Sequence, residues 1–154
     1  MKILSIDTAS NLCTVAVLEN KKCIKEIIVN DARNHSEKIM PVIEQALSES
    51  KLTLQDINLI VCDKGPGSFT GIRIGVGTVL AFKDSLNIPC IGINSLKALT
   101  YPILYSKFNK NIIDNSANLV CSILDCKNEN CYFALYQRNS ELVDNNSQIS
   151  ENIN

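Results

Sequence analysis

The chain has 154 residues, with 15 basic and 16 acidic side chains and a formal net charge of −1. This length favours one domain or two small lobes and suffices to bury roughly 70% of the unfolded surface. Without a polybasic block, the sequence has no electrostatic footprint for binding nucleic acid directly. No run of about 18 apolar residues is present, and Asp7 interrupts the apolar start, so we expect neither a membrane-spanning helix nor a signal peptide.

The first thirty residues predict three strands, at 2–8, 12–19 and 23–30, and the short polar links between them indicate an antiparallel meander. Apolar residues then recur at helical spacing over 35–50. Asn34, with Glu37 three residues later, resembles a capping box at the start of this helix. Pro41 should kink the helix or delay its regular part.

The middle of the chain alternates between strand and helix patterns. It predicts a strand at 57–63, a helix at about 70–86, a strand at 88–93 and a third helix from Ser95 to about 106. Together with the meander, this order predicts an α/β fold with a mixed five-stranded sheet and three helices.

The composition changes after Lys110. Strand-like runs from Leu119 to Leu124 and from Cys131 to Gln137 flank a polar loop, and we expect them to open a second lobe. A two-stranded hairpin is marginal by itself, which makes that lobe incomplete. We therefore predict an N-terminal lobe at 1–106, the start of a second lobe at 107–138 and a polar, disordered tail at 139–154.

The seven cysteines are an odd number without close pairs, which favours reduced thiols and a cytoplasmic protein. Most of them lie in apolar runs, where a free cysteine behaves as a small hydrophobic residue. Cys121, Cys126 and Cys131 are spaced by five residues, which fits no zinc pattern, so the interpretation as buried thiols is preferred over metal ligands.

A glycine-rich run at Gly65–Gly75 lies between a predicted strand and a predicted helix. It is neither a Walker loop nor a dinucleotide fingerprint, because the Lys-Ser/Thr pair and the G-x-G-x-x-G spacing are missing. Two interpretations stay open: a structural turn whose glycines permit close packing, or a cradle for a phosphate or nucleotide. For the second, the candidate residues are Asp7, Thr8, Gly65, Gly67, Ser68, Thr70 and Gly71.

Asp7 is predicted to end the first strand, with Thr8 next to it. Its carboxylate could hold a metal–nucleotide complex, or it could cap the turn through the local backbone. The residues alone do not decide between these two roles.

The helix after the glycine run is apolar over most of its circumference, and Arg73 is its only charge before Lys83. Such a helix must be buried on all sides, whereas a sheet covers one side only. Gly71 and Gly75 would let a second helix approach closely. Either the other two helices cover this helix, or a partner chain does, and we favour the partner.

His35 is the only histidine, so a two-histidine helical metal site cannot form. We expect a packing or interface role for it at the start of its helix. No G-x-S-x-G elbow is present, and a cysteine nucleophile would need the same histidine. We therefore predict no catalytic residue and no metal site.

Several of these motifs together carry a resemblance to a known family. Ile6–Ala9, Cys13–Val17, His35-Ser36-Glu37 with Met40-Pro41, and the glycine run resemble the TsaB family of bacterial tRNA threonylcarbamoyladenosine biosynthesis proteins, in order and spacing. The similarity runs from residue 2 to about 137. It implies an actin-like ATPase (ribonuclease H-like) fold with two related lobes, of which the second is only begun here.

The resemblance also implies a function. TsaB proteins are non-catalytic partners of TsaD, which transfers threonylcarbamoyl to adenosine 37 of tRNA, and an ATPase subunit, TsaE, joins them. TsaD carries an H-x-x-x-H metal motif, and the matching place here has His35 but Ile39. The resemblance implies tRNA contact only through a partner, and ATP or ADP with Mg²⁺ as possible ligands.

The first two helices would form the face that binds TsaD or a second copy of the chain. The residues predicted for that face are His35, Ile39, Ile43, Ile72, Gly75, Val76, Val79 and Phe82. Two alternatives remain: an ATP-dependent phosphotransferase of the same superfamily, which would need a complete second lobe, and a homodimer that only binds nucleotide.

Overall fold

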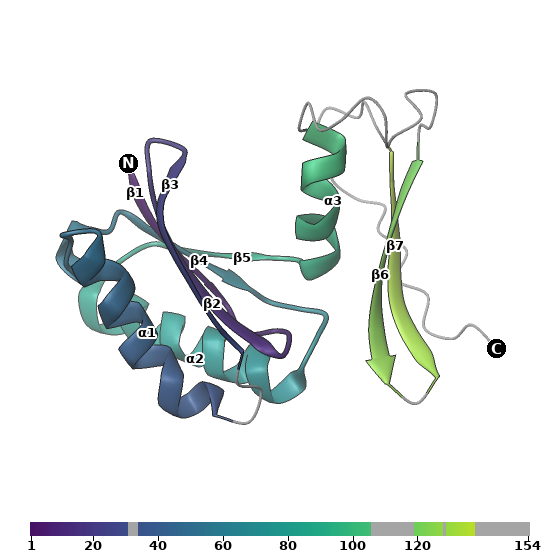
Figure 1. Cartoon of the computed structure of the whole chain (residues 1–154), viewed down its shortest axis with the longest axis horizontal. Coiled ribbons are helices and arrows are strands. Elements are labelled where there is room, and N and C mark those ends of the chain that lie inside the picture. The colour runs from purple at the N-terminus through teal and green to yellow at the C-terminus, as the bar shows by residue number, and fades with distance from the viewer. Residues whose placement is uncertain (31–33, 106–118, 128, 138–154) are drawn as a thin grey trace. The chain divides into compact units, whose positions relative to one another are not determined.

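A mixed five-stranded sheet forms the first half of the protein, in the order β3-β2-β1-β4-β5 (Figure 1). The computed structural model describes residues 1–30, 34–105, 119–127 and 129–137. The strands of the sheet are β1 (Lys2–Asp7), β2 (Leu12–Glu19), β3 (Lys22–Asn30), β4 (Leu59–Asp63) and β5 (Cys90–Ile93). The first three pair antiparallel, and β4 and β5 add to β1 in parallel. The predicted meander and mixed sheet are confirmed.

Two helices, α1 (His35–Glu49) and α2 (Phe69–Leu86), cover one face of this sheet (Figure 1). Alternate residues of the central strands point into this layer, as the period of two in a strand requires. The core consists of those residues, the inner faces of both helices, Ile57 and Ile88. Its strand members are Leu4, Ile6, Cys13, Val15, Val17, Ile60 and Cys62.

Two details of α1 differ from the prediction. The Asn34 side chain makes no capping hydrogen bond, although its backbone carbonyl accepts from the N–H groups of Glu37 and Lys38 at 3.0 Å. The predicted capping box is therefore wrong. The helix also runs unbroken through Pro41, because its buried residues at helical spacing, among them Ile39 and Ile43, hold both halves of the helix on one core.

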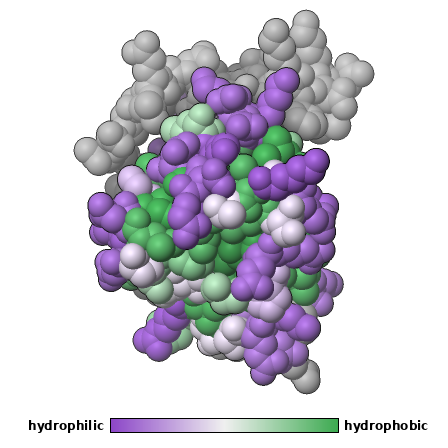
Figure 2. Space-filling model, turned by 90° about the vertical axis from the view of Figure 1, so that its left-hand side faces the viewer, coloured by the Kyte–Doolittle hydropathy of each residue, from purple (hydrophilic) through white to green (hydrophobic). Residues whose placement is uncertain are grey.

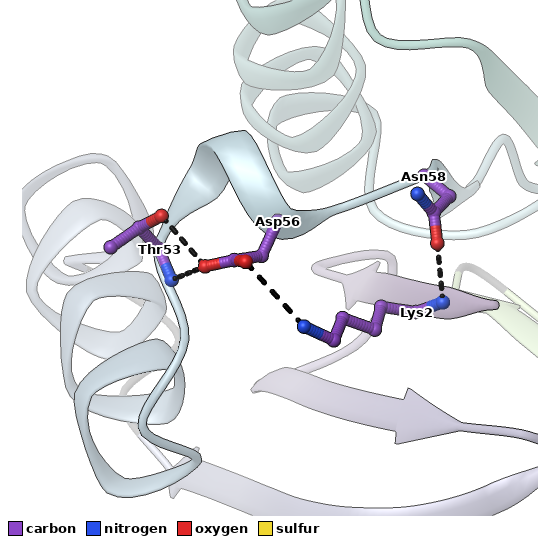
Figure 3. A network of polar contacts seen from close by, with 4 residues as sticks. All are labelled: Lys2, Thr53, Asp56 and Asn58. Atoms are coloured by element: carbon purple, nitrogen blue, oxygen red, sulfur yellow. Dashed lines mark hydrogen bonds and ion pairs between the residues drawn. The ribbon is translucent and has the colours of Figure 1, made fainter.

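A short 3₁₀ helix, η1 (Leu54–Asp56), links α1 to β4 and is joined to the start of β1 (Figure 3). The Asp56 carboxylate accepts from the N–H and the hydroxyl of Thr53, at 2.9 and 2.8 Å. It also forms an ion pair with Lys2 at 3.5 Å, and the Lys2 N–H donates to Asn58 Oδ1 at 2.8 Å. These polar contacts fix where the chain enters β4.

The contacts divide the chain into two compact units, Met1–Ile93 and Asn94–Asn154. In the second unit, α3 (Ser95–Tyr105) packs on a hairpin of β6 (Leu119–Lys127) and β7 (Asn130–Gln137). The Ser122 hydroxyl donates to the Leu96 carbonyl at 2.9 Å. By its contacts, α3 belongs to the same unit as the hairpin. The sequence had instead predicted this helix to be the last element of the N-terminal lobe, which was expected to end at residue 106. The tail predicted at 139–154 lies outside the described residues.

Apolar surface remains exposed on the molecule. On the side shown in Figure 2, hydrophobic side chains form an area bordered by hydrophilic ones. In α2, Phe69 is 68% exposed and Leu80 is 45% exposed, so the helix layer does not bury all of its own apolar side chains. Such exposed groups are candidates for contact with another molecule.

Candidate functional site

The glycine run forms the loop between β4 and the start of α2. Gly65 has φ +93°, a conformation that side chains rarely allow, and the Gly65–Pro66 peptide is cis. The Gly65 N–H donates to Asp63 Oδ1 at 2.7 Å. Ser68 caps α2, since its hydroxyl accepts from the Gly71 N–H at 3.2 Å. The loop thus turns sharply and starts the helix, as the sequence predicts.

The remaining glycines of the run pack against the turn between β1 and β2. A Cβ atom at Gly67 would overlap the Ala9 carbonyl oxygen, and one at Gly71 would overlap that of Thr8. At Gly75 it would overlap the Thr8 hydroxyl. Only glycine therefore lets the first turns of α2 lie directly on this turn.

Hydrogen bonds join the same two segments. The Ser68 N–H donates to the Ala9 carbonyl at 2.6 Å, and the buried Thr8 hydroxyl donates to the Gly71 carbonyl at 2.7 Å. The Ile72 N–H is bonded to the Ser68 carbonyl at 2.8 Å. A phosphate cradle needs free N–H groups, and those of Gly65, Ser68, Gly71 and Ile72 all donate within the protein. The geometry thus favours the structural turn over the cradle.

Asp7 and Asp63 end the neighbouring parallel strands β1 and β4, one residue past the paired Ile6 and Cys62. The Asp7 carboxylate caps the local turn by accepting from the Ala9 N–H at 2.8 Å. Burial raises the pKa of Asp7 above its ordinary value of 3.8; the Ala9 hydrogen bond opposes this, nearby Asp63 adds to it, and His35 opposes it. In the described part of the chain, no group of three or more His, Cys, Asp or Glu could hold a metal ion.

His35 is the first residue of α1 and only 4% exposed. Its Nε2 lies 3.0 Å from the Ser10 carbonyl oxygen, and because a carbonyl only accepts, Nε2 carries the proton. Nδ1 is buried and has no hydrogen-bond partner among the described residues. The ring therefore ties α1 to the same turn that holds α2. Of the two roles predicted for His35, the contacts show packing.

The structure places most of the predicted partner-binding residues in the protein's own core. Ile39, Ile43, Val79 and Phe82 are at most 8% exposed, as is His35, and Gly75 is buried against Thr8. Ile72 and Val76 are half-buried. These side chains pack between α1, α2 and the sheet, so they position the helices.

A different set of side chains faces outward from α2, and sequence reasoning missed it. The set, called here the exposed face of α2, consists of Phe69, Thr70, Arg73, Gly77, Leu80, Ala81 and Asp84. At about 100° per residue these positions share one side of the helix. The sequence signal was available: the run Gly71, Gly75 and Val79 marks the inner side, and the opposite side follows from the helical period.

Comparison with known proteins connects this arrangement to a family. The model of the family TsaD, tRNA N6-adenosine threonylcarbamoyltransferase, matches residues 22–150. The chain belongs to the TsaD family. TsaD-family relatives named "tRNA threonylcarbamoyladenosine biosynthesis protein TsaB" are 38% identical over 92% of the chain in Buchnera aphidicola and 34% identical over 90% in Escherichia coli. The resemblance to TsaB is thereby confirmed.

The chain spans 63% and 56% of the length of these two relatives. Among solved structures, YeaZ from Pseudomonas aeruginosa superimposes with a TM-score of 0.71 at 24% identity, over 88% of this chain and 60% of that one. A ROK hexokinase from Thermus thermophilus gives 0.52 at 11% identity, over 96% and 50% of the two chains. These likenesses confirm the actin-like α/β fold of this TsaD-family chain. No helix in its described residues is both long and apolar enough to cross a membrane.

Proposed function

We propose that this chain is a non-catalytic subunit in the formation of N6-threonylcarbamoyladenosine at position 37 of tRNAs. The observation that carries the proposal is its similarity to TsaB proteins over about nine tenths of its length. Its single histidine supports the same role, because the ring is buried and its Nε2 is bound to the Ser10 carbonyl. This His35 serves the fold, so catalysis falls to a partner.

The partner in this proposal is a TsaD-type transferase that binds α1 and α2. The exposed face of α2 supports this choice, because Phe69 and Leu80 present apolar side chains to solvent in the middle of charged and small residues. TsaE would join the assembly through the transferase. With a net charge of −1 the chain would meet tRNA only through its partners, in the cytoplasm.

Replacing Leu80 with Glu tests the proposal. Leu80 is 45% exposed, so the monomer should stay folded, while a charge in the contact should abolish co-purification with the transferase. Ser85→Glu is the matched control, since Ser85 is exposed but lies outside the exposed face of α2. Transferase capture that is equal for L80E and wild type would refute the proposed surface. Glutamate at the buried Val79 or Phe82 would instead disrupt the core.

Nucleotide binding needs its own test. We propose that the glycine loop takes no phosphate, because four of the N–H groups at the loop and helix start donate internally, and Gly67 and Gly71 face backbone atoms of the β1–β2 turn. Titration calorimetry of the whole chain with ATP and Mg²⁺ should give no heat of binding. Binding that disappears in Asp7→Asn would contradict this and would support a nucleotide-binding protein.

A further inference from the structure

Two helices that begin far apart in the sequence are anchored on consecutive residues of one turn. The Ser10 carbonyl accepts from the His35 ring at the start of α1, and the Ala9 carbonyl accepts from the Ser68 N–H at the start of α2. The Thr8 hydroxyl donates to a carbonyl in the first turn of α2. A displacement of one helix start must therefore move the turn or break a bond to it.

The turn is itself braced by hydrogen bonds to the strands that it joins. The Asp7 carboxylate, at the end of β1, accepts from the Ala9 N–H at 2.8 Å. The Ser10 hydroxyl accepts from the N–H of Leu12, the first residue of β2, at 3.1 Å. Because a braced turn moves as one body, it can pass a displacement from one helix start to the other, which a loose loop would absorb.

We propose that His35 is a positioning residue for α2. By holding Ser10, its ring fixes the turn on which the start of α2 rests, and so it sets the rotation of the exposed face of α2, to which it does not belong. The ring is 4% exposed, and its one hydrogen bond to the described residues is that of Nε2. An event at the start of α1 thereby changes the surface that α2 presents, which is a coupling between the two helices.

A matched pair of substitutions at His35 tests the positioning role. His35→Met fills the space without a donor, whereas His35→Gln supplies an amide N–H donor in its place. Hydrogen exchange of the whole chain, followed by NMR, should show the Ser68 amide exchanging roughly tenfold faster in His35→Met, and near the wild-type rate in His35→Gln. A Ser68 rate that is unchanged in His35→Met, or equal in both variants, would overturn the proposal.

Leu47→Ala is the control for a general loss of stability. Leu47 is buried in the core near the other end of α1, so its truncation destabilises the protein without touching the turn. Relative to the amides of β1, the Ser68 amide should exchange no faster in Leu47→Ala than in wild type. If Leu47→Ala and His35→Met sped up the Ser68 amide alike, His35 would be an ordinary core residue and the proposal would fall.

A double-mutant cycle measures the coupling itself. Thr8→Val removes the hydroxyl that binds α2 and keeps the branched shape of the side chain. If the turn joins the two helix starts, the unfolding equilibrium constant of T8V/H35M should differ roughly threefold or more from the product of the two single effects. Single effects that simply multiply would show that the two anchors are independent, which contradicts the proposal.

Ser10→Gly tests the turn without changing either helix. The Ser10 side chain is exposed, so the variant should fold, but it loses the hydroxyl that braces the turn. Exchange should become faster together at the Ser68 amide and at the Lys38 amide in the first turn of α1, and Asn20→Gly in the turn between β2 and β3 should change neither. Faster exchange at one helix start alone would refute the common anchor. These measurements need no transferase, so the inference does not rest on the proposed function.

Discussion

At the scale of single residues, the glycines of the run and of α2 lie in three different environments. Gly65 adopts a left-handed φ, and Gly67, Gly71 and Gly75 make room for the backbone and side chain of the β1–β2 turn. Gly77 has open space around it. The sequence predicts a tight turn and close packing, but it cannot assign these environments, because the turn that Gly67, Gly71 and Gly75 face lies some sixty residues away in the chain.

Gly71→Ala should lower the free energy of unfolding, because the new Cβ would overlap the Thr8 carbonyl and separate α2 from the turn. Overpacking of this kind costs about 1–3 kcal/mol. Gly77→Ala is the matched control in the same helix, and it should raise stability by up to ~1 kcal/mol. Urea unfolding followed by circular dichroism measures both. If Gly71→Ala and Gly77→Ala changed the free energy of unfolding equally, the β1–β2 turn would have moved to accommodate the new methyl group, and the predicted overlap would be refuted.

Asp7→Asn should stabilise the protein at neutral pH. Burial raises the pKa of Asp7, so the folded state loses stability as pH rises through that raised value, where the carboxylate becomes charged. Asparagine stays neutral and still accepts the Ala9 hydrogen bond. Urea unfolding from about pH 3 to pH 8 measures the free energy of unfolding of both proteins. Asp7→Asn and wild type should be equally stable at the acid end, and the variant should become increasingly more stable than wild type as pH rises above the ordinary carboxyl range. Asp7→Ala, which also loses the acceptor, should be less stable than Asp7→Asn.

At the scale of elements, η1 depends on one carboxylate. Asp56 accepts two hydrogen bonds from Thr53 and pairs with Lys2 (Figure 3). The Thr53 N–H, then its hydroxyl and then Lys2 lower the pKa of Asp56, so the stability it contributes is present above its ordinary value of 3.8 and is lost as pH falls through the lowered one.

Asp56→Ala should therefore destabilise the protein at neutral pH and less so in acid. Lys2→Met removes only the exposed 3.5 Å ion pair and should have the smaller effect, because such pairs contribute little. Thermal unfolding of both variants at neutral and acid pH checks the order. If Lys2→Met proved the more harmful, the ion pair and not the capping of η1 would be the main contribution.

Periodicity predicted the elements well because their patterns are local. The strand predicted at 12–19 agrees with β2 (Leu12–Glu19), and the helix predicted at about 70–86 agrees with α2 (Phe69–Leu86), each to within a residue. The predictions that failed concern places where tertiary contacts determine the local structure. The core residues of α1 carry the helix through Pro41, and Asn34 uses its backbone carbonyl instead of its side chain at the helix start.

At the scale of the whole molecule, the core of the first unit is complete within it. Each residue of the buried cluster lies between Leu4 and Ile88. A fragment of residues 1–93 should therefore fold alone, with native-like circular dichroism and a single cooperative thermal transition. A fragment that remains unfolded would show that the first unit depends on the second.

The fold of the chain and its family could be predicted from sequence, but the residues available to a partner could not. The apolar pattern of α2 indicates burial without telling which side is buried. Val79 and Phe82 and the exposed Leu80 read alike in the sequence, yet only the first two contact the core. That distinction depends on the rotation of the helix about its axis, which the Thr8–Gly71 contact sets.

The turn between β1 and β2 holds the beginnings of both helices, α1 through His35 and Ser10 and α2 through Thr8, Ala9 and the glycines. None of these anchors belongs to the exposed face of α2. The residues that orient the two helices are thus separate from the residues with which another protein would make contact. Binding specificity can therefore diverge between homologues, or be redesigned in the laboratory, while the scaffold underneath stays unchanged.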